Sequence, residues 1–117
     1  MIDVKEIKSR NDFSDFLEYN KTELHIVKFG ADWCGPCKLL EQRIKNLDTE
    51  KIGSTLFGEI SIDDQDSEEM EIAIDYGVSN IPVLIFFKNG EMVHKTVGAL
   101  SSENLYALIA KYNDMTE

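Results

Sequence analysis

The hexapeptide Trp33-Cys34-Gly35-Pro36-Cys37-Lys38 restricts the fold more than any other stretch of the chain. An apolar run at 24–29 leads into it, and apolar residues with the spacing of one helical face follow it. Pro36 suits the first turn of a helix, where its missing N–H leaves no hydrogen bond unmade. The pattern therefore predicts a junction at which a buried strand passes directly into a helix.

Both cysteines of the chain lie in this hexapeptide, separated by two residues. Such a pair serves either as half of a zinc site or as a dithiol that opens and closes a disulfide. A structural zinc ion needs four ligands. The chain has no second cysteine pair, and its only histidines, His25 and His94, each lie in a strand-like run. The spacing favours the redox interpretation over the metal site and over two inert thiols.

The two cysteines are predicted to play unequal roles. Cys34 lies just before the helix, where free backbone N–H groups and the helix dipole favour an anion such as a thiolate. The thiolate is the form that attacks a disulfide. Cys37 lies on the helical stripe of Leu40, Ile44 and Leu47 that faces the core. We therefore expect an accessible nucleophile at Cys34 and a shielded resolving thiol at Cys37.

The chain resembles the thioredoxin family over essentially its whole length. The hexapeptide matches the family's active-site motif residue for residue. Ile81-Pro82 resembles the family's cis-proline loop, Lys88-Asn89-Gly90-Glu91 resembles its hairpin, and Val97-Gly98-Ala99-Leu100 precedes the last helix as in that family. Together these matches are far more specific than a Cys-x-x-Cys pair alone.

The resemblance implies a protein-disulfide reductase that a thioredoxin reductase recycles. Cys34 would attack a disulfide of a target protein, and Cys37 would then release the reduced target and close a Cys34–Cys37 disulfide. No bound cofactor is expected, since the disulfide itself carries the electrons. Gly35 and Pro36 between the cysteines tune the redox balance towards reduction, because more oxidising relatives usually carry other residues there.

The resemblance also implies a substrate-binding surface. Pro82 would be cis and face the two sulfurs, while Ile81 would offer backbone hydrogen bonds to an extended substrate segment. Gly98 would form the other edge of this substrate-binding surface, and Trp33 would be a surface tryptophan beside the nucleophile. The alternatives are that Pro82 is a trans proline that starts a strand, that Gly98 is only a turn glycine and that Trp33 is a core aromatic.

The chain departs from the family at two positions near Cys37. Thioredoxins usually carry a buried aspartate where this chain has Lys28, and a lysine where it has Glu59. Because an unpaired buried charge is costly, we expect Lys28 and Glu59 to form a partly buried ion pair beneath Cys37. Glu59 would then accept the proton of Cys37, or Lys28 would lower the pKa of Cys37 directly. The alternative is that both side chains reach solvent and have no chemical role.

Two smaller departures concern the frame of the site. Gly30 replaces a bulky residue that packs behind the motif, so the motif is expected to be less tightly supported. Gln42 replaces the proline that kinks the family's helix, so a straighter helix is expected.

The remaining pattern predicts an α/β fold. Strands are expected at 2–7, 24–29, 55–62, 83–88 and 91–97, and helices from Ser9 to about 20, from the motif to about Lys51, from 68 to Gly77 and from 101 or 102 onward. The order βαβαβαββα indicates the thioredoxin fold, a five-stranded mixed sheet flanked by four helices, in a single domain of residues 1–117. The motif then lies at the carboxyl end of the second strand, where open α/β sheets place their sites.

The acidic run Asp63-Asp64-Gln65-Asp66-Ser67-Glu68-Glu69 suggests a calcium loop at first sight. It lacks the glycine at the sixth position and the glutamate at the twelfth that such loops require. We therefore interpret it as a solvated helix start, where negative charge is favourable. The predicted buried face of that helix is Met70, Ala73 and Ile74.

Composition excludes several partners. The net charge of −10 argues against nucleic acid and anionic membranes, both of which require a basic surface. The longest apolar run, 81–87, is too short to span a bilayer, and the N-terminus shows no signal-peptide pattern. Two cysteines in one reactive motif fit the reducing cytoplasm. We expect a cytoplasmic monomer that carries electrons to disulfide-containing proteins.

Three other functions are also consistent with the sequence. The chain could be a binding or assembly module that keeps the fold and holds a partner around Trp33 and Pro82. It could also be a dedicated electron donor to one client protein, or a folding catalyst. The intact Cys34 and Cys37 favour the reductase over the binding module.

Overall fold

The computed structural model describes residues 1–115. Five strands form one sheet: β1 Val4–Glu6, β2 His25–Gly30, β3 Leu56–Ser61, β4 Val83–Lys88 and β5 Glu91–Val97. Five helices surround it: α1 Arg10–Glu18, α2 Gly35–Lys45, α3 Thr49–Ile52, α4 Glu68–Asp75 and α5 Ser102–Asn113. No helix within residues 1–115 combines the length and the apolar character needed to cross a membrane.

The sheet has the strand order β1-β3-β2-β4-β5. β2 pairs parallel with β3 and antiparallel with β4, so the sheet is mixed as predicted. All six residues of β2 are buried. A strand buried on both faces reads as a continuous apolar run rather than an alternating one, which explains the pattern at 24–29.

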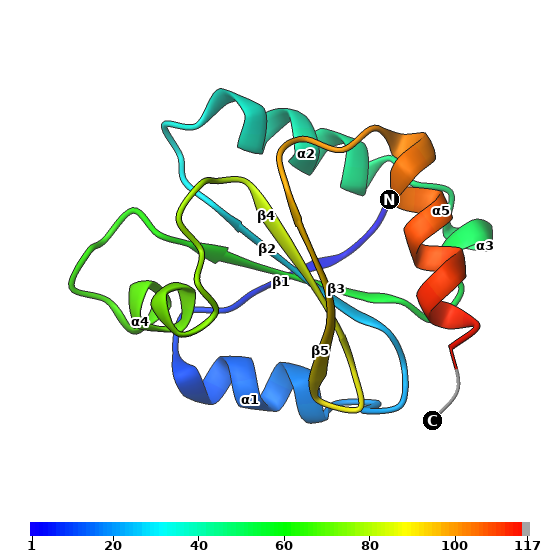
Figure 1. The fold of residues 1–117 in the computed structure, drawn as a ribbon, viewed down its shortest axis with the longest axis horizontal. Coiled ribbons are helices and arrows are strands. Elements are labelled where there is room, and N and C mark those ends of the chain that lie inside the picture. Colours follow the sequence, from blue (N-terminus) through cyan, green and yellow to red (C-terminus); the bar gives the residue numbers. More distant parts are fainter. Residues whose placement is uncertain (116–117) are drawn as a thin grey trace.

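Helices cover both faces of the sheet (Figure 1). On one face, α2, α3 and α5 bury a cluster that includes Ile26, Leu40, Phe86 and Leu105. On the other, α1 and α4 bury a second cluster that includes Val27, Phe29 and Ile72. Adjacent residues of β2 thus contribute to opposite cores, and this central strand fixes the position of the loop that follows it.

Local signals in the sequence account for several element ends. Ser9 caps α1, and its hydroxyl accepts a hydrogen bond from the Asp12 N–H at 3.0 Å. Asn89 and Gly90 both have positive φ, as a type I′ hairpin turn requires. The hairpin joins β4 and β5 in antiparallel register.

The predicted number of helices is wrong by one. The helix expected to reach Lys51 ends at Lys45, and a separate short helix, α3, follows. Asp48 causes the break, because its carboxylate accepts a hydrogen bond from the Glu50 N–H at 2.9 Å and starts the new helix. A short acidic side chain competes for backbone N–H groups in this way and so favours a cap over a helix interior.

The buried face predicted for α4 is also partly wrong. Ile72 and Ala73 are buried and Met70 is partly buried, but the side chain of Ile74 is 66% exposed. On α5, Leu105, Ile109 and Tyr112 are buried, while Leu108 is only partly buried. On α4 the buried stripe is therefore shifted from the predicted one, with Ile72 buried in place of Ile74.

We predict that Gly58→Ala destabilises the fold by about 1–3 kcal/mol. An added Cβ would lie 2.7 Å from Ile7 Cδ1 and 3.2 Å from the Phe16 ring, both in the core beneath α1. Urea unfolding measures the change. Gly35→Ala is the matched control, because a Cβ there meets nothing within 4 Å. Equal stability of Gly58→Ala and the wild type would contradict the packing described here.

Candidate active site

The two cysteines lie where β2 passes into α2. Cys34 is the N-cap residue of α2, and its Sγ accepts a hydrogen bond from the Cys37 N–H at 3.2 Å. A disulfide joins Cys34 to Cys37, with the two Cα atoms 5.3 Å apart. The Cys34 sulfur therefore already lies at the helix N–H groups that would stabilise its thiolate in the reduced protein.

The exposure of the two cysteines follows the predicted order but differs little. Cys34 is 6% exposed and Cys37 is 1% exposed. Both pack with Ala31 and with the partly buried Ile62 and Ile81. In this oxidised state Cys34 is therefore more covered than the sequence led us to expect. Trp33 beside it is 74% exposed, so it is a surface residue and not a core aromatic.

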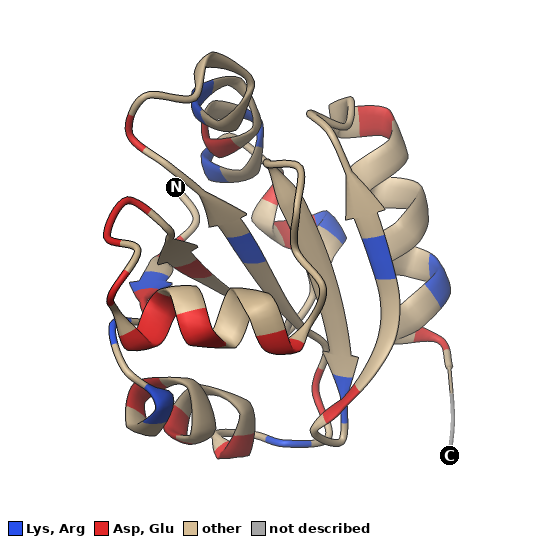
Figure 2. Ribbon diagram, turned by 60° about the vertical axis from the view of Figure 1, so that its left-hand side comes forward, with Lys and Arg blue, Asp and Glu red and all other residues tan. Residues whose placement is uncertain are grey.

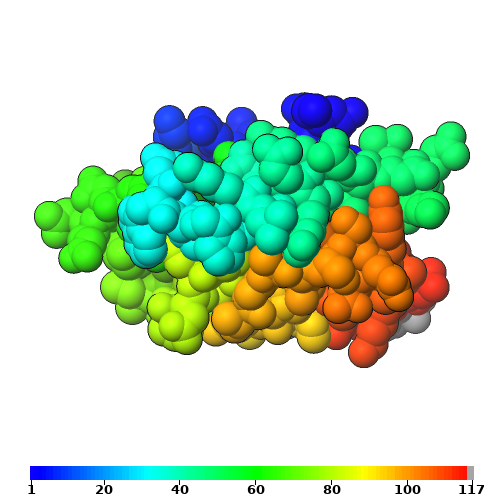
Figure 3. Space-filling model, turned by 90° about the horizontal axis from the view of Figure 1, so that it is seen from above, coloured from blue at the N-terminus to red at the C-terminus, as the bar shows by residue number. Residues whose placement is uncertain are grey.

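The other predicted substrate-binding residues lie together beside the cysteines. The Ile81–Pro82 peptide bond is cis, as the resemblance implied. The Pro82 carbonyl accepts a hydrogen bond from the Gly98 N–H at 2.8 Å, and Gly98 has a φ of +99°, which favours glycine. Figure 3 shows the start of α2, the segment before β4 and the segment after β5 side by side on one face.

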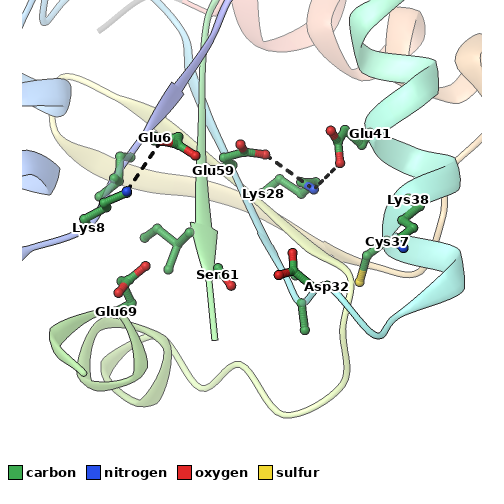
Figure 4. A pocket seen from close by; sticks show the side chains of 14 residues that line it. Glu6, Lys8, Lys28, Asp32, Cys37, Lys38, Glu41, Glu59, Ser61 and Glu69 are labelled. Carbon is green, nitrogen blue, oxygen red and sulfur yellow. Dashed lines mark ion pairs between the residues drawn. The ribbon is translucent and has the colours of Figure 1, made fainter. Parts of the chain in front are cut away.

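Lys28 forms ion pairs with two carboxylates behind Cys37 (Figure 4). Its side chain is only 9% exposed, and its Nζ lies 3.6 Å from Glu59 Oε2 and 3.8 Å from Glu41 Oε2. Lys28 and Glu59 face each other in register on β2 and β3. The predicted Lys28–Glu59 ion pair is therefore present.

This ion cluster borders the same pocket as Cys37. The pocket has a volume of about 220 Å³ and is lined by Lys28, Glu59, Glu41 and Cys37 among others. At Gly30, an added Cβ would lie 3.3 Å from Cys37 Sγ and 3.6 Å from Lys28 Nζ. The absence of a side chain at Gly30 thus leaves the thiol and the ammonium on either side of one small space.

Glu41 is a member of this cluster that the sequence analysis missed. Lys45 donates a hydrogen bond to Glu41 Oε1 at 2.9 Å, and this bond, aided by the charge of Lys28, lowers the pKa of Glu41 below its ordinary value. The same bond raises the pKa of Lys45. The sequence spacing could have indicated Glu41, because it follows Cys37 by four residues and so lies on the same side of the helix.

The calcium and zinc interpretations find no support in the side chains. Ser67 caps α4 by accepting from the Met70 N–H at 3.1 Å, so the acidic run is a helix start as interpreted. Asp63 accepts hydrogen bonds from the Asp32 N–H at 3.1 and 3.2 Å. Within residues 1–115, no three His, Cys, Asp or Glu residues are grouped to hold a metal ion. Figure 2 shows the acidic segments along α1, α4 and the loop before α4.

Comparisons with known proteins agree with this geometry. The family model described as Thioredoxin matches residues 4–111. A thioredoxin of Chlamydia caviae is 38% identical over 110 residues, which cover 94% of this chain and 99% of that protein. A mitochondrial thioredoxin of Mus musculus is 35% identical over 100 residues, 86% of this chain, and the match spans 57% of its length.

A solved structure agrees as well. The X-ray structure of Fasciola hepatica thioredoxin superposes with a TM-score of 0.80 at 27% sequence identity, covering 92% of this chain and 98% of that one. The family model covers most of the chain and includes both cysteines, Pro82 and Gly98. Thioredoxins work through a reversible disulfide and carry no prosthetic group. The chain therefore belongs to the thioredoxin family of thiol–disulfide oxidoreductases.

Proposed function

We propose that this chain is a cytoplasmic electron carrier that reduces disulfides of other proteins and that a thioredoxin reductase recycles. The observation that supports this most directly is the Cys34 sulfur at the N-terminus of α2, 3.2 Å from the Cys37 N–H. A sulfur held at free N–H groups is stabilised as the attacking thiolate, and a second thiol one turn away can resolve the intermediate without diffusion.

The proposed reaction proceeds in two exchanges. The Cys34 thiolate attacks one sulfur of a target disulfide, a Cys34–target bond forms, and the other target sulfur leaves as a thiolate. Cys37 loses its proton and attacks Cys34 Sγ, so that the Cys34–target bond breaks and the Cys34–Cys37 bond forms. The target gains two electrons from the cysteine pair. A thioredoxin reductase then supplies two further electrons, which reduce the Cys34–Cys37 disulfide again.

We further propose that residues 1–117 act as a single monomeric domain in a reducing compartment. One continuous five-stranded sheet and cysteines confined to one motif support this. The net charge of −10 favours protein partners with basic surfaces over nucleic acid or anionic membranes. Trp33, Ile81, Pro82 and Gly98 are the proposed docking surface for the target.

We also propose that Lys28 and Glu59 tune the second exchange. Lys28 and Cys37 border the same pocket, so the ammonium charge favours the Cys37 thiolate. Glu59 is the candidate acceptor of the Cys37 proton. Glu41 is less suited to that role, because the hydrogen bond from Lys45 that lowers its pKa also makes it a weaker base.

The first prediction for this function concerns the cysteines. Cys34→Ser should abolish reduction of insulin disulfides, because the attacking thiolate is lost and the remaining Cys37 is buried. Cys37→Ser should also stop turnover but should accumulate a covalent mixed disulfide with target proteins, visible as a mass shift that dithiothreitol reverses. Failure of the wild type to reduce insulin disulfides would support the binding-module alternative instead.

The second prediction concerns the ion pair. Glu59→Gln should shift the pH profile of insulin reduction, because the candidate proton acceptor is lost, and Lys28→Met should shift it by removing the charge beside Cys37. The measurement is the rate of reduction from pH 5 to 9. Unchanged profiles in both variants would show that the pair has no role in proton transfer.

The third prediction separates Glu41 from Glu59. Glu41→Gln should shift the pH profile of reduction less than Glu59→Gln does, because Glu41 is not the proposed proton acceptor, but it should lower the free energy of unfolding at pH 7. Because the folded-state pKa of Glu41 is lowered, its contribution is complete above the unfolded-state pKa and is lost as the pH falls through the folded-state pKa. The stability difference between variant and wild type should therefore shrink in acid, and a difference that grew in acid would contradict the assignment.

A further inference from the structure

Arg43 of α2 contacts a segment that is distant in sequence but close to the site. Its Nη1 donates hydrogen bonds to the carbonyl oxygens of Ala99 at 2.8 Å and Leu100 at 2.9 Å. Arg43 itself is half-buried. A guanidinium that donates to two carbonyls makes charge-assisted hydrogen bonds, which are shorter and stronger than bonds between neutral groups.

The segment that Arg43 holds is the loop between β5 and α5, residues 98–101. The loop is tied at one end to the segment before β4, because the Gly98 N–H donates to the Pro82 carbonyl at 2.8 Å. Within it, the Leu100 N–H donates to the Gly98 carbonyl at 3.1 Å. Arg43 supplies the link to α2, so three separate segments become one connected frame (Figure 1).

One part of this frame lies beside the two cysteines. Ile81 packs against the cysteines, Pro82 follows it, and Gly98 is bonded to Pro82. Trp33 and Val97 are exposed apolar side chains, 74% and 59% exposed. Because Cys34 is almost covered, a protein segment that reaches its sulfur has to lie across these neighbours. A small-molecule disulfide, in contrast, has to contact only the Cys34 sulfur.

We propose that Arg43 is a positioning residue for protein substrates. It fixes the 98–101 loop against α2, so the far edge of the docking surface is in place before the target arrives. Preorganisation of this kind improves binding by reducing the conformational freedom lost on association. The inference rests on the proposed reductase function and names a residue that acts through the loop rather than on the sulfur.

The test compares Arg43→Met with the wild type on two substrates. For insulin, KM should rise roughly three- to tenfold with kcat changed less than about twofold, as expected when a preorganised contact is lost. For 5,5′-dithiobis(2-nitrobenzoate), the rate of reduction by the dithiol form should stay within about twofold. Arg43→Lys keeps a cationic donor on the same helix position and should show a smaller rise in KM for insulin only.

Lys111→Met is the matched control, because it also removes one positive charge but lies on α5 against the Tyr112 ring. It should leave both substrates unaffected. The proposal is overturned if Arg43→Met and Arg43→Lys leave KM for insulin unchanged, or if both substrates lose rate equally. Failure of the wild type to reduce insulin would instead overturn the reductase function, so the two failures are distinguishable.

Discussion

The structure depends on the placement of one sulfur atom at the first turn of α2. β2 is the central strand of the sheet and all its residues are buried, so α2 follows a strand that is held by packing on both faces. Cys34 caps that helix with its sulfur. The cap that starts the helix and the proposed attacking thiolate are therefore the same group. A shift of β2 or of α2 would therefore displace the helix cap and the reactive sulfur together.

The charges behind the site follow from the cost of burial. Lys28 is almost fully buried, and an unpaired ammonium there would be strongly unfavourable. The chain places two carboxylates, Glu41 and Glu59, around it and a second cation, Lys45, beside Glu41. The formal charges of these four groups cancel. A buried ion cluster is weak evidence for stability, but this one lines the same pocket as Cys37, which is why we propose that it influences the proton of that residue.

Much of the fold and the centre of the site could be predicted from the sequence because their signals are local. The hairpin at Asn89-Gly90, the cap at Ser9 and the strand-to-helix junction each depend on residues a few positions apart. The break before α3 was missed because Asp48 can cap one helix or lie on the surface of another, and periodicity does not distinguish the two. Ile74 was misplaced because one residue of helical phase separates the buried stripe from solvent.

The parts of the site that sequence alone did not reveal come from side chains of one helix that reach different neighbours. Along α2, Glu41 reaches Lys28 of β2, while Arg43 reaches the carbonyls after β5. Each contact joins positions that are many residues apart, so no local pattern announces it. Because Cys34, Glu41 and Arg43 belong to one rigid element, the nucleophile, the charge cluster and the docking loop keep fixed positions relative to one another. In the proposed mechanism Lys28 influences the proton of Cys37 and Arg43 positions the loop that the target meets, so substitutions of the two residues should affect separate kinetic steps.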